Sequence, residues 1–110
     1  MSEDRATYKV TATPSTLQAF KNLPCALPYD HEHFVPPSPG QVAALIELTG
    51  WSQNQVAKIC GVNYGPKGST AVRKWKTVTG SESRAIPYAA WRLLLLHSNV
   101  VELGDAPVRG

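Results

Sequence analysis

Three basic residues, Arg73, Lys74 and Lys76, stand close together after a glycine-rich stretch of the chain. An arginine guanidinium offers two parallel N–H donors, which match the O6 and N7 acceptors of guanine. A lysine ammonium is a compact charge on a flexible stem, and it suits contacts with phosphate groups. The hydroxyls of Ser69 and Thr70 just before them suit either a base edge or a phosphate. Together these residues have the chemistry of a DNA-contacting surface.

The positive charge of the chain is concentrated in the same region. Residues 51–92 hold seven basic residues against one acidic residue, which gives a net charge of +6. Residues 1–50 carry −2 and residues 93–110 carry −1, so the overall charge of +3 conceals a localised one. A localised positive surface favours a polyanionic partner, because each neutralised phosphate releases condensed counterions.

Residues 40–96 are expected to form four helices in the order helix–helix–loop–helix–helix. Ser38 and the proline after it are typical of a helix start, and Gly50 can end that helix in the left-handed conformation. The next helix begins at Ser52, which can form an S-x-x-Q capping box with Gln55. Two short helices joined by a few residues that include glycine form the first half of a helix-turn-helix unit.

The third of these helices should begin at Ser69 or Thr70, with Val72 and Trp75 facing inward. The residues expected on its outward side are Thr70, Arg73, Lys74 and Thr77. The last helix should cover residues 88–97. The residues expected to face the core from this helix are Trp91, Leu94 and Leu95.

Residues 1–37 are expected to form an N-terminal arm before a domain at 38–103 and a tail at 104–110. The alternating pattern of residues 8–11 could form a short strand, which would pair with the same strand of a second subunit. A short helix follows in the arm, with Leu17, Phe20 and Leu23 on one apolar side. Residues 24–39 contain five prolines and are expected to be an extended connector.

Two motifs carry a resemblance to a known family. The first is Ser52-Gln53-x-x-Val56-Ala57-x-x-Cys60-Gly61-Val62, and the second is Val72-x-x-Trp75 followed by Gly80. With the residues around them, over roughly positions 38–99, they resemble the lambda-repressor-like, or XRE, family of phage and plasmid regulators. The flanking motifs of the resemblance are Pro39-Gly40-Gln41-Val42 and Ile86-Pro87-Tyr88-Ala89-Ala90-Trp91-Arg92-Leu93-Leu94.

The resemblance implies an all-α, four- to five-helix DNA-binding domain in which the third domain helix enters the major groove. It also implies that Gln53 binds a backbone phosphate, with Asn54 beside it. The connection at residues 63–71 is longer than is usual in the family and carries Tyr64 and Lys67. Either the recognition helix begins earlier, or a loop reaches the DNA beside it. The candidate DNA-contacting residues are therefore Ser52, Gln53, Asn54, Tyr64, Lys67, Ser69, Thr70, Arg73, Lys74, Lys76 and Thr77.

The function expected from these features is sequence-specific repression of transcription by occlusion of a promoter, with the protein's own promoter as one candidate target. A homodimer on an inverted repeat of double-stranded DNA is expected, because one small domain reads few base pairs. The arm is the favoured dimer contact, and the alternative is the last helix with Val100, Val101 and Leu103. An RNA-binding regulator and a protein-interaction module are the rival interpretations.

Other classes of function find little support in the sequence. The Asp30-His31-Glu32-His33 cluster lacks the four ligands of a closed zinc site, and no cofactor is expected. Cys25 and Cys60 are expected to remain reduced. No nucleotide-binding loop or nucleophile motif indicates an enzyme. No stretch approaches the ~20 apolar residues that span a bilayer, so a cytoplasmic protein is expected.

Overall fold

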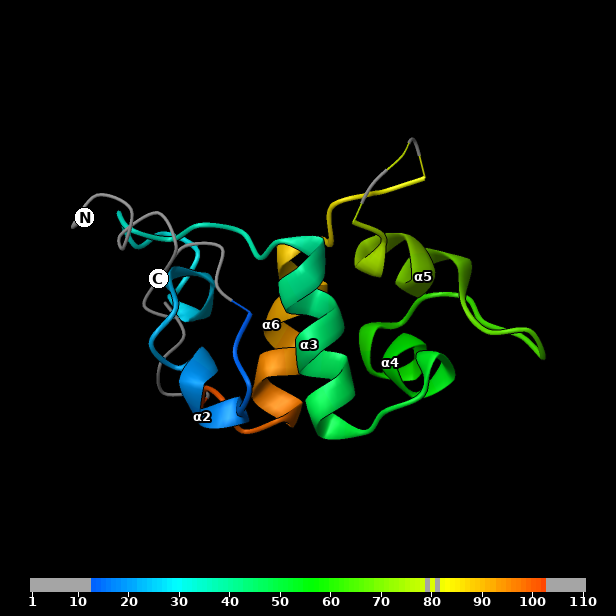
Figure 1. Ribbon diagram of the computed structural model, residues 1–110, viewed down its shortest axis with the longest axis horizontal. Coiled ribbons are helices and arrows are strands. Elements are labelled where there is room, and N and C mark those ends of the chain that lie inside the picture. Colours follow the sequence, from blue (N-terminus) through cyan, green and yellow to red (C-terminus); the bar gives the residue numbers. More distant parts are fainter. Residues whose placement is uncertain (1–12, 79, 81, 103–110) are drawn as a thin grey trace.

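The computed structural model describes residues 13–78, 80 and 82–102. In this part of the chain a short helix and a 3₁₀ turn precede four longer helices, and no β-strand is formed. The elements are α2 (Leu17–Phe20), η1 (Pro24–Ala26), α3 (Pro39–Thr49), α4 (Gln53–Cys60), α5 (Thr70–Lys76) and α6 (Tyr88–His97). The all-α fold expected from the sequence is confirmed. Figure 1 places α4 and α5 at one end, α2 at the other end, and α3 and α6 between them.

The starts of α3 and α4 are fixed by the two predicted serine caps. The Ser38 hydroxyl accepts from the Gln41 amide at 3.1 Å, and the Gln41 side chain accepts from the Ser38 amide at 2.9 Å. Ser52 and Gln55 form the same reciprocal pair at 3.1 and 2.7 Å. Each pair satisfies two amide donors that a helix start leaves without partners, so the capping boxes fix where both helices begin.

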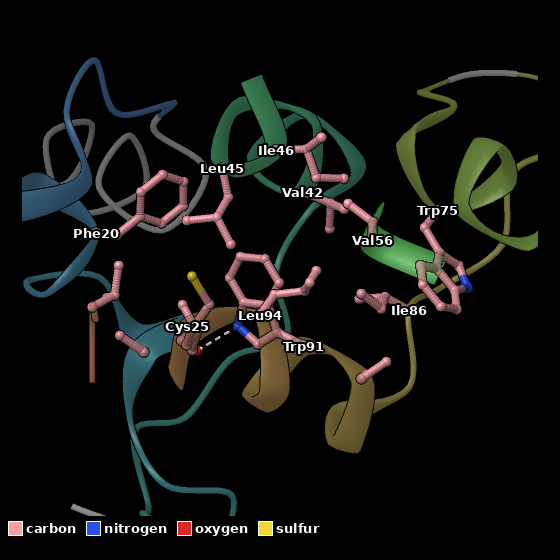
Figure 2. Packing of buried hydrophobic residues seen from close by; sticks show 14 of the residues in the cluster. Phe20, Cys25, Val42, Leu45, Ile46, Val56, Trp75, Ile86, Trp91 and Leu94 are labelled. Atoms are coloured by element: carbon pink, nitrogen blue, oxygen red, sulfur yellow. Dashed lines mark hydrogen bonds between the residues drawn. The ribbon is translucent and has the colours of Figure 1, made fainter. Parts of the chain in front are cut away.

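A single apolar core holds these helices together. Figure 2 shows Val42 and Leu45 of α3 facing Trp91 and Leu94 of α6, with Phe20 of α2 closing one side. The inward positions expected on the last two helices are confirmed, because all of them are buried: Val72, Trp75, Trp91, Leu94 and Leu95. Burying several large side chains is the main stabilising term that a chain of this size can build.

The segment before Ser38 contributes to the same core, which the sequence did not indicate. Pro24–Ala26 forms a 3₁₀ turn instead of extended chain, and both Cys25 and Ala26 are buried. Trp91 Nε1 donates to the Cys25 carbonyl at 2.8 Å, and Arg92 Nη1 donates to the Ala26 carbonyl at 3.2 Å. Donors on α6 therefore satisfy the carbonyls of this turn, and the expectation of an extended connector was wrong there.

Several other expectations concern residues outside the described part of the chain. The candidate strand at residues 8–11, the tail at 104–110 and Leu103 belong to this group. The division of the chain at residues 37, 38 and 103 stays a prediction. None of the helices in the described ranges has both the length and the apolar character that a membrane-spanning segment needs.

Candidate DNA-binding surface

The helix α5 is fixed on its inner side and open on its outer side. It packs against α3 and α4, and α4 in turn packs against α6. Val72 and Trp75 anchor α5 in the core, and Figure 2 shows Trp75 beside Ile86. Thr70 and Arg73 are exposed on the opposite side. The helical period of 3.6 residues thus separates an apolar inner side from an outer side that carries a guanidinium.

The other candidates on α5 differ in how far their side chains are already engaged. Lys74 Nζ lies 4.0 Å from a carboxylate oxygen of Glu82, and the Lys74 side chain is only 25% exposed. Thr77 uses its hydroxyl to donate to the Arg73 carbonyl at 2.8 Å. Lys76 is partly exposed. Arg73 is therefore the candidate best placed to reach a base, and the lysines beside it can reach phosphates.

Ser69 caps α5 from a buried position. It is 2% exposed, its hydroxyl donates to the Asn63 carbonyl at 2.8 Å, and the same oxygen accepts from the Val72 amide at 3.4 Å. A buried hydroxyl with both bonds inside the protein has no route to a base edge or a phosphate. The capping role that the sequence suggested for Ser69 is confirmed, and we leave it out of the exposed surface.

The candidates at the start of α4 hold the neighbouring loop in place. The Gln53 side-chain oxygen accepts from the Ser69 amide at 3.0 Å. Asn54 Nδ2 donates to the Gly65 carbonyl at 3.0 Å, and Ser52 caps its own helix. These contacts join the first turn of α4 to the chain that leads into α5. Phosphate contacts by the three residues stay a prediction.

The long connection between α4 and α5 forms a projecting hairpin, which we call the hairpin loop (residues 62–68). Gly65 and Gly68 exchange two main-chain hydrogen bonds of 2.9 Å across a turn at Pro66 and Lys67. Tyr64 is 48% exposed, and Lys67 is exposed at the turn. Figure 1 shows the hairpin loop extending beyond both helices. Because α5 begins only at Thr70, the additional residues form a loop beside it rather than an earlier helix start.

A groove of about 730 Å³ separates the hairpin loop from α5. Polar and basic side chains line it from both sides: Tyr64 and Asn63 from the hairpin side, and Thr70, Lys74 and Arg84 from the other. Two cations and two hydroxyls along an open groove suit phosphate oxygens better than an apolar ligand.

Sequence comparison relates the chain to known transcriptional repressors. No protein-family model and no solved structure matches the chain. It is 38% identical over 63 residues to the transcriptional repressor protein KorC of Escherichia coli, covering 57% of this chain and 67% of that protein. A second KorC sequence from Escherichia coli is 36% identical over the same shares. The chain belongs to the KorC family.

Membership of the KorC family does not test the likeness to the lambda-repressor-like family, which stays a prediction. The matches also do not test which residues of a KorC-family protein contact DNA. DNA contacts by the ten candidates other than Ser69 therefore remain predictions, and the structure adds where each side chain lies. Of the candidates on α5, Thr70 and Lys74 line the groove that faces the hairpin loop.

Two basic residues at this surface of the KorC-family chain were not among the candidates. Lys58 Nζ lies 5.7 Å from the centroid of the Tyr64 ring, which is a cation–π distance. Arg84 lines the groove, and its amide donates to the Lys74 carbonyl at 3.1 Å. The sequence indicated Lys58 and Arg84 only as part of the local excess of positive charge, because neither residue lies on the outer side of α5.

The residues considered for metal or redox chemistry are not assembled into a site. In the described ranges no group of three metal-ligating side chains comes together, and His33 pairs with Glu32 at 3.3 Å on the surface. Cys25 and Cys60 are both free thiols. Burial raises the pKa of Cys25 to about 12 and that of Cys60 to about 11, which keeps both thiols protonated and poorly nucleophilic.

Proposed function

We propose that this KorC-family protein binds double-stranded DNA of a particular sequence and represses transcription by occluding a promoter. The observation that carries the proposal is the outer side of α5, where Arg73 is exposed while Val72 and Trp75 anchor the helix from behind. A helix held in this way can enter the major groove without loss of its packing. The names of the relatives, both repressors, support the same conclusion, and we propose no catalytic activity.

We further propose that the protein acts in the cytoplasm as a homodimer on an inverted repeat. Two α5 helices about 34 Å apart would enter successive major grooves on one side of the duplex. Val100 and Val101, one of the two expected dimer contacts, are buried in the core of one chain. This supports the contact through the N-terminal arm, which the sequence already favoured. The promoter of the protein's own gene is one candidate target.

Selection of bound duplexes from a random pool tests the proposal directly. A single enriched motif with two-fold symmetry is expected, and its affinity should fall steeply with salt because phosphate contacts release counterions. Enrichment of single-stranded RNA over duplex DNA would favour the RNA-binding interpretation. Salt-independent binding without any enriched sequence would contradict DNA recognition altogether.

Deletion of residues 1–12 tests the dimer contact, because it spares every residue of the described core. Sedimentation should give a dimer for the full chain and a monomer for the shortened chain. A shortened chain that stays dimeric would contradict assembly through the candidate strand at residues 8–11.

A further inference from the structure

The hairpin loop has the features of a second DNA-contacting element, and this inference rests on the proposed function. We propose that the sugar–phosphate backbone at the edge of the bound major groove lies in the groove between the hairpin loop and α5. Lys67 then enters the minor groove that flanks each half-site. The protein would read its operator from two grooves, with Arg73 on one side of a strand and Lys67 on the other.

The hairpin loop is held in a fixed position relative to α5. Asn54 of α4 donates to the Gly65 carbonyl beside the turn, and the Ser69 hydroxyl at the start of α5 donates to the Asn63 carbonyl at the other end of the loop. The Gln53 side chain accepts from the Ser69 amide and so joins α4 to the start of α5. Gly68 has a φ of +106° and packs so closely on Gln53 that a β-carbon would overlap the Gln53 side-chain oxygen. These contacts lie within the protein itself, so little ordering entropy should oppose docking of the loop.

The loop carries positive charge at the places that would face a duplex. Lys67 is exposed at the turn, and Lys58 is exposed beside the ring of Tyr64. Residues 58–76 contain five basic residues and no acidic residue. The charge therefore continues from the outer side of α5 across the groove to the end of the hairpin loop.

The proposed path of the DNA backbone through the protein groove follows from the geometry of B-form DNA. Each major groove is bordered by two backbones, and a minor groove lies beyond each of them. If α5 occupies the major groove, an element that flanks it across one backbone must meet the adjacent minor groove. The groove of about 730 Å³ lies between these two elements, and Thr70, Lys74 and Arg84 supply phosphate-binding groups along it. The long, exposed side chain of Lys67 suits the narrow, strongly negative minor groove of A·T-rich DNA.

The first test is hydroxyl-radical footprinting of the full chain on its selected operator, comparing wild type with Lys67→Ala. Wild type should protect the half-site and also the sugars across the flanking minor groove. Lys67→Ala should lose only the flanking protection. Lys67→Ala should also weaken the salt dependence of binding. The loss of affinity between 50 and 200 mM salt should be about 3.5-fold smaller for the variant than for wild type, as expected for one lost phosphate contact. The matched control is Lys21→Ala, an exposed lysine after α2 at the opposite end of the molecule, which should leave the footprint unchanged.

The second test changes the DNA in the minor groove alone. Inosine in place of guanine removes the N2 amino group from the minor groove and leaves the major-groove face intact. Inosine in the flank should strengthen binding of the wild type, while Lys67→Ala should be indifferent to it.

The possible results separate this inference from the function on which it rests. Specific binding of the operator with a footprint that Lys67→Ala leaves unchanged would overturn the role of the hairpin loop and keep the repressor. Failure of the wild type to prefer any duplex would overturn the proposed function, and this inference would fall with it.

Discussion

The indole Nε1 of Trp91 donates a 2.8 Å hydrogen bond to the main-chain carbonyl of Cys25, and this bond joins α6 to the turn before α3. The ring of Phe20 lies 6.1 Å from the Trp91 ring, in a tilted arrangement that aromatic pairs favour. The residues of α2 and η1 therefore belong to the same core as α3 and α6, and α3 in turn packs against α5. Loss of the α2 and η1 side chains from the core would therefore weaken the packing behind α5 as well as the packing of the N-terminal segment.

Phe20→Ala should lower the free energy of unfolding by about 3–5 kcal/mol, because it leaves a cavity in a fully buried site. Urea denaturation followed by tryptophan fluorescence measures the change. Gln18→Ala, on the exposed side of the same helix, is the matched control and should change stability by less than about 0.5 kcal/mol. Equal effects of the two substitutions would show that α2 is not part of the core.

The sequence predicted those features that depend on neighbouring residues. The N-cap at Ser38 and the capping box at Ser52 each involve at most four consecutive residues, so their residue types alone indicate the helix starts. The bond between Cys25 and Trp91 joins residues 66 positions apart, and no local pattern reports it. The five prolines of residues 24–39 favoured extended chain, although proline is also compatible with the first turn of a helix.

The candidate site was predictable to a similar degree. The inward spacing of Val72 and Trp75 correctly left Arg73 outward, because helical periodicity fixes opposite sides. The burial of Ser69 depends on the path of the hairpin loop, whose carbonyl at Asn63 lies within reach only once the loop has folded. The spacing of residue types along the chain does not predict loop geometry of this kind.

Arg73→Ala should remove most of the preference for the operator and leave the melting temperature nearly unchanged, because the side chain is exposed. A lost bidentate contact with guanine corresponds to about 1–3 kcal/mol of discrimination, or roughly 5- to 150-fold. Competition gel shifts with operator and random duplexes give this ratio. Arg73→Lys keeps the charge and should retain affinity for random DNA while losing discrimination. Undiminished discrimination in both variants would exclude Arg73 from base reading.

Lys76→Ala should weaken binding to all duplexes alike, since an ammonium on a phosphate carries no sequence information. The slope of log affinity against log salt should become smaller by about one unit. Lys21→Ala removes the same charge from the opposite end of the molecule and should leave the slope unchanged. If both variants lower the slope equally, the effect comes from net charge and not from a contact at α5.

Gly68→Ala should destabilise the protein by about 1–3 kcal/mol, because a side chain at φ +106° is strained and its β-carbon would displace Gln53. Displacement of Gln53 breaks its bond to the Ser69 amide, so operator binding should weaken as well. Gly65→Ala is the matched control, since its β-carbon would meet nothing within 4 Å. Thermal melting measures the stability of the two variants, and gel shifts measure their affinity for the operator. Equal melting temperatures and equal affinities would refute this role of Gly68.

Alkaline pH should destabilise the protein through the buried thiol of Cys25. Burial raises the pKa of Cys25 from 9.0 to about 12, so between these pH values the unfolded chain releases a proton that the folded chain retains. The unfolded state then binds fewer protons, and the free energy of unfolding falls as pH rises above about 9. Urea denaturation of wild type and Cys25→Ala, each relative to its own value at pH 7, isolates this effect from the other groups that titrate there. The variant should lose less stability between pH 9 and 11, and its bond from Trp91 should persist because the acceptor is a main-chain carbonyl. Identical pH profiles would mean that the Cys25 thiol ionises as readily in the folded chain as in the unfolded one, which its burial opposes.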